Sequence, residues 1–134
     1  MSHKRTFLSL DVGEKRIGVA LGDDAVRIAI PYTTIEVDGT EVDQIAQIIT
    51  GNDVATVVVG YPRNQSGEAT AQTTYAEEFA KRLTDIVQKI EFQDESLTSV
   101  LAEQQLKAMG RPYGKGDIDA RAASIILQDY LERL

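Results

Sequence analysis

Cysteine is absent from this chain of 134 residues, and histidine occurs once, as His3 near the amino terminus. The chain therefore forms no disulfide bond and no thiolate metal site, and the shortage of nitrogen ligands disfavours zinc. Long hydrophobic runs are missing too, since no apolar stretch approaches the ~18 residues that a membrane-spanning helix needs. Residues 1–5 lead directly into a strand-like run and lack the apolar core of a secretory signal peptide. We predict a cytoplasmic protein without a membrane partner.

Basic residues are also scarce: 14 lysines and arginines accompany 21 acids, which gives a formal net charge of −7. This balance weighs against a nucleic-acid partner, because proteins that bind phosphates usually have basic patches. The acidity is concentrated between residues 36 and 95, which hold twelve acids and four bases. The two ends of the chain are nearly neutral, and a protein that uses metal ions as counter-charges needs fewer lysines. The charge balance weakens a nucleic-acid hypothesis without removing it.

The first quarter of the chain predicts a β-meander. Strand-like runs at residues 5–12, 16–22 and 26–36 are joined by short turns, as in an antiparallel sheet. Pro31 favours an edge position for the third strand, because proline has no backbone N–H to donate. The whole chain, residues 1–134, has a length that suits one domain with one core.

Alternating strands and helices follow the meander. A β-branched run at residues 55–60 predicts a strand buried on both faces, and residues 90–95 predict a short fifth strand. Periodicity predicts four helices: one around residues 42–49, a long one with an apolar stripe from Tyr75 to Ile90, one at 98–109 ended by Gly110, and one at 117–132 with Asp117 as its N-cap. The order implies an α/β fold: a five-stranded mixed sheet with helices on its faces, the meander being extended by parallel strands. This is the RNase H-like arrangement, in which the first strand is central.

Three acids are predicted to converge in that arrangement. Asp11 ends the apolar run of the first strand and Glu95 ends the fifth strand, and sites in open α/β sheets form beyond the carboxyl ends of strands. Asp119 shares a helical stripe with Ala123 and Ile126, an apolar face that would turn its carboxylate toward the sheet. An ionised carboxylate in such a place is costly unless it has a partner.

Convergent carboxylates are suitable ligands for Mg²⁺, which prefers oxygen ligands and keeps several waters. Two such ions about 3.5–4 Å apart activate water and stabilise the leaving oxygen of a phosphodiester. We therefore predict Asp11, Glu95 and Asp119 as both catalytic and metal-binding residues. A structural alternative stays open, in which Asp11 bonds turn amides or pairs with Lys15, Arg16 or Lys115.

Further polar side chains are candidate contacts to a phosphate-bearing substrate. They lie in the glycine-bearing hairpin after the first strand, in the loop after the fourth strand, at the start of the third helix, and in a basic loop before the last helix. For each position a simpler interpretation stays open: a plain hairpin, a strand-to-helix turn, a helix cap or a solvated loop. The candidates are Lys15, Arg16, Arg63, Thr98, Arg111 and Lys115.

Five segments together resemble the YqgF family, also called RuvX. Its members are RuvC-like proteins described as Holliday junction resolvases and as pre-16S rRNA nucleases. The resemblance covers nearly the whole chain. Ser96 departs from it, because the family usually has arginine at this position, and the loop before Asp119 is less basic than in many relatives. The segments are residues 10–20 (LDVGEKRIGVA), 58–62 (VVGYP), 94–99 (DESLTS), 118–123 (IDARAA) and 126–131 (ILQDYL).

The resemblance implies an RNase H-like fold, dependence on Mg²⁺ or Mn²⁺, and trimming of ribosomal RNA precursors in the cytoplasm. It assigns catalytic roles to Asp11, Glu95 and Asp119, the same acids that the physical argument selects. It also makes structured RNA, here pre-16S rRNA, the first substrate to consider, with ribosomal particles as a further partner.

Three other hypotheses stay open. The same site could cut branched DNA, as a Holliday junction resolvase does, although the sequence shows no dimer face and we expect a monomer or weak dimer. The Asp-x-Gly hairpin is similar to the phosphate loops of actin-like ATPases, which need two domains around a cleft. A non-catalytic ribosome-assembly factor that binds nucleotide or RNA would need none of the catalysis.

Overall fold

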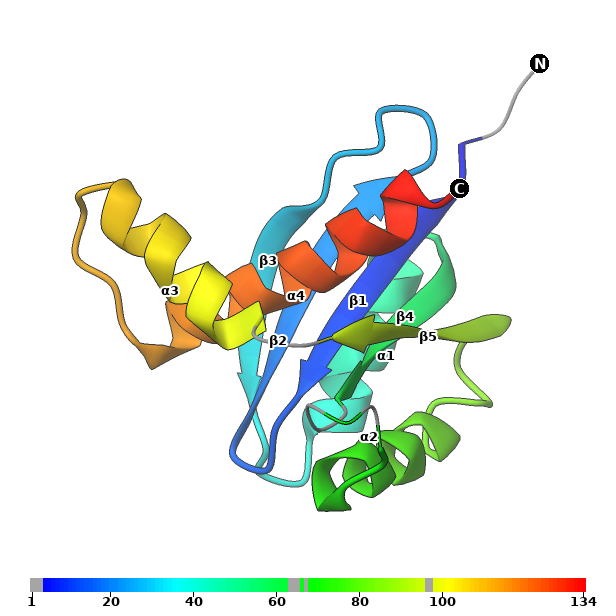
Figure 1. Ribbon diagram of the computed structural model, residues 1–134. Helices are drawn as coiled ribbons and strands as arrows, with labels where there is room; N and C mark the ends of the chain where they lie inside the picture. The colour runs from blue at the N-terminus through cyan, green and yellow to red at the C-terminus, as the bar shows by residue number, and fades with distance from the viewer. Residues whose placement is uncertain (1–3, 63–65, 67, 96–97) are drawn as a thin grey trace.

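The structure is a computed structural model that describes residues 4–62, 66, 68–95 and 98–134. It is an α/β sandwich in which helices cover both faces of one sheet (Figure 1). The elements in chain order are β1 (Thr6–Val12), β2 (Arg16–Asp23), β3 (Ile30–Glu36), α1 (Glu41–Gly51), β4 (Val54–Pro62), α2 (Ala71–Lys81), β5 (Lys89–Glu95), α3 (Thr98–Ala108) and α4 (Lys115–Glu132).

The five strands lie in the order β3-β2-β1-β4-β5. The first three pair antiparallel, whereas β4 pairs parallel with β1 and β5 pairs parallel with β4. The predicted mixed sheet with a central first strand is therefore confirmed. The edge position that Pro31 indicated for the third strand is confirmed as well, and the β2–β3 register shifts beside that proline.

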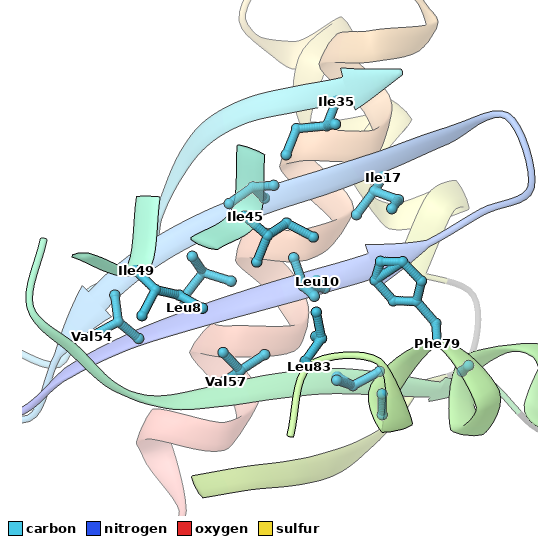
Figure 2. Packing of buried hydrophobic residues seen from close by; sticks show 14 residues of the cluster. Leu8, Leu10, Ile17, Ile35, Ile45, Ile49, Val54, Val57, Phe79 and Leu83 are labelled. Carbon is cyan, nitrogen blue, oxygen red and sulfur yellow. The ribbon is translucent and has the colours of Figure 1, made fainter. Parts of the chain in front are cut away.

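Alternation along β1 separates two hydrophobic cores. Leu8 and Leu10 point to the face that α1 and α2 cover, where Ile45 and Phe79 pack against them (Figure 2). Phe7 points to the opposite face and packs under α4. Full burial of each such side chain contributes about 1.5–3 kcal/mol, so both faces fix the register of the central strand. The same alternation places Asp11 on the face covered by α4.

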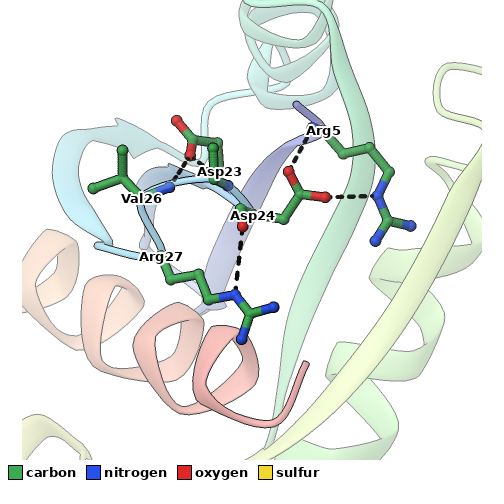
Figure 3. A network of polar contacts seen from close by, with 6 residues as sticks. Arg5, Asp23, Asp24, Val26 and Arg27 are labelled. Carbon is green, nitrogen blue, oxygen red and sulfur yellow. Dashed lines mark hydrogen bonds and ion pairs between the residues drawn. The ribbon is translucent and has the colours of Figure 1, made fainter. Parts of the chain in front are cut away.

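The third strand begins later than the sequence pattern predicts, at Ile30 instead of residue 26. A polar turn occupies the intervening residues (Figure 3). The Asp23 carboxylate accepts the backbone N–H groups of Ala25 and Val26 at 3.0 and 2.8 Å, and the Asp24 carboxylate accepts the Nε of Arg5 at 2.9 Å. These bonds stabilise a turn conformation that local side chains offer in competition with a sheet ladder.

The second helix is shorter than its apolar stripe predicts. It ends at Lys81, and the chain then turns through contacts of 3₁₀ type, in which the N–H of Leu83 bonds to Ala80 O at 3.0 Å. Leu83 still packs in the core, but Ile90 belongs to β5, where it pairs with Val57. Packing against the sheet therefore continues the apolar pattern after the helix has ended.

The last helix begins at Lys115, two residues before the predicted start. Gly114 is its N-cap, and Asp117 lies at the third helical position, where its carboxylate accepts the Gly114 N–H at 2.8 Å. The prediction of Asp117 as the N-cap is wrong, although the side chain does satisfy a backbone donor at this helix terminus.

The third helix lies beside α4 and, with the loop that joins them, projects past the sheet as a helical hairpin (Figure 1). Gly110, at φ +72°, ends α3 as predicted, because glycine adopts this left-handed conformation without a steric penalty. In the part of the chain that the structure describes, none of the helices has the length and apolar character needed to cross a bilayer.

Candidate active site

The carboxyl ends of β1, β4 and β5 lie at one edge of the sheet, since these three strands are parallel. Asp11 is the sixth residue of β1, and Glu95 is the last residue of β5, opposite Pro62 of β4. The Glu95 carboxylate lies over Gly60 of β4: a Cβ built there would lie 2.6 Å from Glu95 Oε2 and 2.7 Å from Ile126 of α4. The absent side chain at Gly60 therefore leaves room for Glu95 to extend across β4 on the face that Asp11 shares.

Helix α4 brings the third acid to this face. It lies so close to β2 that any side chain at Gly18 would collide with the backbone of Asp119 and Ala120. The buried hydroxyl of Ser9 donates to Ala123 O at 2.6 Å and fixes the helix over β1. Close approach of helix and sheet, made possible by small residues, thus places Asp119 beside the end of β1.

The three carboxylates affect one another electrostatically. Burial is the larger cause and the negative charge of Asp119 the smaller, and together they raise the pKa of Asp11 to about 6. Burial and, to a smaller extent, the charge of Asp11 raise the pKa of Glu95 to about 8. A hydrogen bond from Thr98 Oγ1 at 3.4 Å opposes that rise. Raised pKa values of this kind mark negative groups that lack a counter-charge. Clusters of that type are characteristic of functional sites.

Asp119, by contrast, already has a cationic partner. Arg16 Nε donates to Asp119 Oδ2 at 2.7 Å, and this bond raises the pKa of the guanidinium above its ordinary value. The alternative considered from the sequence was a pair between a nearby base and Asp11. Among the residues that the structure describes, Asp11 forms no such pair, and the arginine bonds to the neighbouring acid of the cluster.

The donor set has the chemistry of a hard divalent cation site. Asp11 lies near the end of the central strand β1 and Glu95 ends the edge strand β5, and among the described residues neither carboxylate has a basic partner. As the side chains are placed, no three carboxylate or histidine side chains of the described chain converge tightly enough to hold one ion. Arg16 bonds to Asp119 Oδ2, an oxygen that would otherwise be available to a cation. The oxygen chemistry and the missing counter-charge at Asp11 and Glu95 nevertheless fit Mg²⁺ or Mn²⁺.

The predicted substrate contacts fall into three groups. Thr98 is buried and bonds to Glu95, and Arg16 bonds to Asp119, so both orient acids of the cluster. The side chains of Lys15, Arg111 and Lys115 are exposed, and none of them pairs with a carboxylate of the described residues. Arg63 lies outside the described residues, as does Ser96, the departure from the family pattern.

Two positions that shape the site are missed by reasoning about charged residues. Gly18 and Gly60 have no functional group, yet they set where Asp119 and Glu95 can lie. The only sequence signal is a glycine inside each strand pattern, which indicates a close approach of other atoms.

Comparisons with known proteins agree with this geometry. Residues 5–133 match a family model described as "RuvX: Holliday junction resolvase". A protein of Chloroflexus aggregans named "Putative pre-16S rRNA nuclease" is 45% identical over 135 residues, which cover 97% of this chain and 95% of that protein. A protein of the same name from Synechocystis sp. is 44% identical over 137 residues, which cover 98% of this chain and 90% of that protein.

Among solved structures, Thermus thermophilus RuvC in complex with a Holliday junction substrate superposes with a TM-score of 0.57. The match covers 96% of this chain and 94% of the RuvC chain at 11% identity, so it shows a shared RNase H-like fold. The family model, the full-length relatives and the fold are consistent with one another. This chain belongs to the RuvX family.

Proposed function

We propose that this protein is a divalent-cation-dependent nuclease that processes the precursor of 16S ribosomal RNA. The observation on which the proposal depends is the cluster at the sheet edge, where Asp11 and Glu95 share a half-buried site and have no counter-charge among the described residues. The names of the full-length relatives support RNA as the substrate. We expect the protein to act in the cytoplasm, on structured RNA or on ribosomal particles.

The proposed roles follow from the position of each side chain. Asp11 and Asp119 would hold the cation, and Glu95 would complete its ligand shell or orient the attacking water. Mg²⁺ or Mn²⁺, when bound, activates water and stabilises the leaving oxygen of a phosphodiester. Arg16 orients Asp119 through the 2.7 Å bond, and Thr98 orients Glu95 through its hydroxyl. At neutral pH without a cation, Glu95 retains a proton, because its pKa is about 8.

The exposed bases supply contacts to phosphate beside this cluster. Lys15 lies in the turn between β1 and β2, and Lys115 is the first residue of α4. Lys15 follows Asp11 by four residues and Lys115 precedes Asp119 by four, and we propose that both contact the phosphate backbone of the substrate. Arg63, which follows β4 in the sequence, is a further proposed contact.

The test compares Asp11→Asn with the wild type in cleavage of a precursor RNA that spans an end of 16S rRNA. In Mg²⁺ or Mn²⁺ we expect the substitution to reduce cleavage at least about a hundredfold, because an electrostatic contact to the reacting group is lost. Asp129→Asn is the matched control, since Asp129 is an exposed carboxylate of α4. Equal cleavage by wild type and Asp11→Asn would contradict the proposal.

Branched DNA is the second candidate substrate, favoured by the family model's description and by the fold shared with RuvC. The same proteins should be assayed side by side on a four-way DNA junction. Cleavage of the junction but not of the precursor RNA would make this protein a resolvase that uses the same acids.

A further inference from the structure

A pocket outside the acidic cluster lies between the α3–α4 hairpin and the start of β3. Its volume is about 290 Å³, close to the lower end of the ~300–1,000 Å³ that small-molecule sites occupy. We call it the hairpin pocket. It combines apolar walls with two guanidinium groups, and its main lining residues are Pro31, Met109, Arg111, Pro112, Tyr113 and Arg121.

Among the described residues, neither arginine of the hairpin pocket has an acidic partner. Arg121 Nε is buried and finds no hydrogen-bond acceptor in this part of the chain, and the Arg121 Nη2 contacts the sulfur of Met109 at 3.6 Å. Sulfur is a weak acceptor, and a buried donor left without an acceptor costs free energy. Arg111 is exposed and pairs with no carboxylate of the described chain. Two guanidinium groups and the single carboxylate of Asp117 line the pocket, which leaves one unmatched positive charge and favours an anionic ligand.

The remaining walls of the pocket are preformed. The Tyr113 hydroxyl donates to Glu103 Oε2 at 2.8 Å, which fixes the aromatic ring between the loop and α3. Asp117 also lines the pocket, but its carboxylate is engaged by the Gly114 N–H. Proline, methionine and tyrosine side chains offer flat apolar contacts of the kind on which unstacked bases pack.

The pocket also lies within reach of the acidic cluster. Arg121 follows Asp119 by two residues on α4, so the two side chains leave the helix on nearly opposite sides. A helix with its side chains is about 10–12 Å across, and Asp117, Ala120 and Arg121 of the pocket lie within one turn of Asp119 along α4. A substrate strand that passes across this part of α4 therefore reaches both the cluster and the pocket.

From these observations, and provided that the proposed nuclease function holds, we infer that the hairpin pocket binds one unpaired nucleotide of the substrate. The phosphate pairs with Arg111 and Arg121, and the base packs against Met109, Pro112 and Tyr113. A base inside a duplex cannot enter the pocket, so the pocket selects substrates with a single-stranded, bulged or looped nucleotide near the cut.

The test is binding of two fluorescein-labelled RNAs, a short single strand and a fully paired duplex, measured by fluorescence anisotropy. EDTA is present so that the RNA stays intact, because the pocket needs no metal. The variants are Arg121→Met, which keeps the length and apolar stem of the side chain, and Arg111→Gln, which changes an exposed residue and leaves the fold unaffected. Lys107→Gln is the matched control, since it removes one positive charge from the same hairpin outside the pocket.

We expect each arginine variant to weaken binding of the single strand about tenfold, within the ~10–150-fold range of a lost specific contact, while Lys107→Gln changes it less than twofold. The affinity for the duplex RNA should change by the same small factor in all three variants. The inference is wrong if both arginine variants match the control, or if single strand and duplex lose affinity alike. The binding assay and the cleavage assay test different proposals. If the wild type binds the single strand selectively but cleaves no RNA, the proposed nuclease function is wrong and the proposed role of the pocket stands. If the wild type cleaves RNA but the arginine variants lose no selective binding, the nuclease function stands and the proposed role of the pocket is wrong.

Discussion

Replacing Glu95 with glutamine is expected to stabilise the metal-free protein at neutral pH. The pKa of Glu95 rises from 4.5 to about 8 on folding. The folded protein therefore binds more protons than the unfolded chain throughout this window, and the free energy of unfolding falls as the pH rises from 4.5 to 8. At pH 7 this penalty amounts to about 3 kcal/mol, at ~1.4 kcal/mol per pKa unit.

Glutamine has the same shape and no charge, so it removes the penalty at pH 7 and changes little at pH 4. We expect a gain of about 1–3 kcal/mol, because Asp11 adjusts its own protonation when Glu95 is absent. For a chain of this size the gain corresponds to a rise in Tm of about 3–10 °C. The assay is thermal unfolding in EDTA at both pH values.

Glu91→Gln is the control on the same strand, since Glu91 forms a surface pair with Lys89 at 3.0 Å and loses at most about 1 kcal/mol. Addition of Mn²⁺ should then raise the Tm of the wild type more than that of Glu95→Gln, because a bound cation supplies the missing counter-charge. If Glu95→Gln is no more stable than Glu91→Gln at pH 7 in EDTA, the reasoning about an uncompensated buried carboxylate is refuted.

Of three further predictions, two concern the supports of the site and one concerns Glu41 at the start of α1 on the opposite face of the sheet. Gly18→Ala should destabilise the fold by about 1–3 kcal/mol and reduce cleavage without removing any functional group, because the added methyl group pushes α4 away from the sheet. Gly51→Ala is its control in both unfolding and cleavage assays, because a Cβ added there meets nothing within 4 Å. Ser9→Ala should cost about 1–3 kcal/mol in chemical denaturation, since the Ala123 carbonyl loses its 2.6 Å partner in a buried site; no change in the denaturation midpoint would show that the bond does not hold α4. The pKa of Glu41 is lowered by backbone N–H groups and by Arg82, so this carboxylate contributes stability that is present above pH ~4.5 and is lost as the pH falls. Glu41→Gln should therefore be less stable than the wild type at pH 7 and lose less stability on acidification. Parallel acid-unfolding curves of the two proteins would contradict this.

Much of the fold could be predicted because its signals are local. Alternation in β1 and β2, the β-branched run of β4 and the edge signal of Pro31 are properties of short segments, and the structure confirms each of them. The errors lie at element ends. The turn after Asp23 delays β3, and α2 stops at Lys81, because hydrogen bonds at these ends compete with the apolar pattern.

The site divides in the same way. The sequence by itself determined that Asp11 and Glu95 lie at strand ends and that Asp119 lies on an apolar helix face, since strand alternation and helical period are properties of short segments. Only the tertiary structure decided that Arg16 bonds to Asp119 instead of Asp11, and that Gly18 and Gly60 give α4 and Glu95 their places. It also decided that Arg111 and Arg121 line one pocket. These are contacts between segments distant along the chain, and their partners are selected by close packing of helix against sheet, which no local pattern specifies.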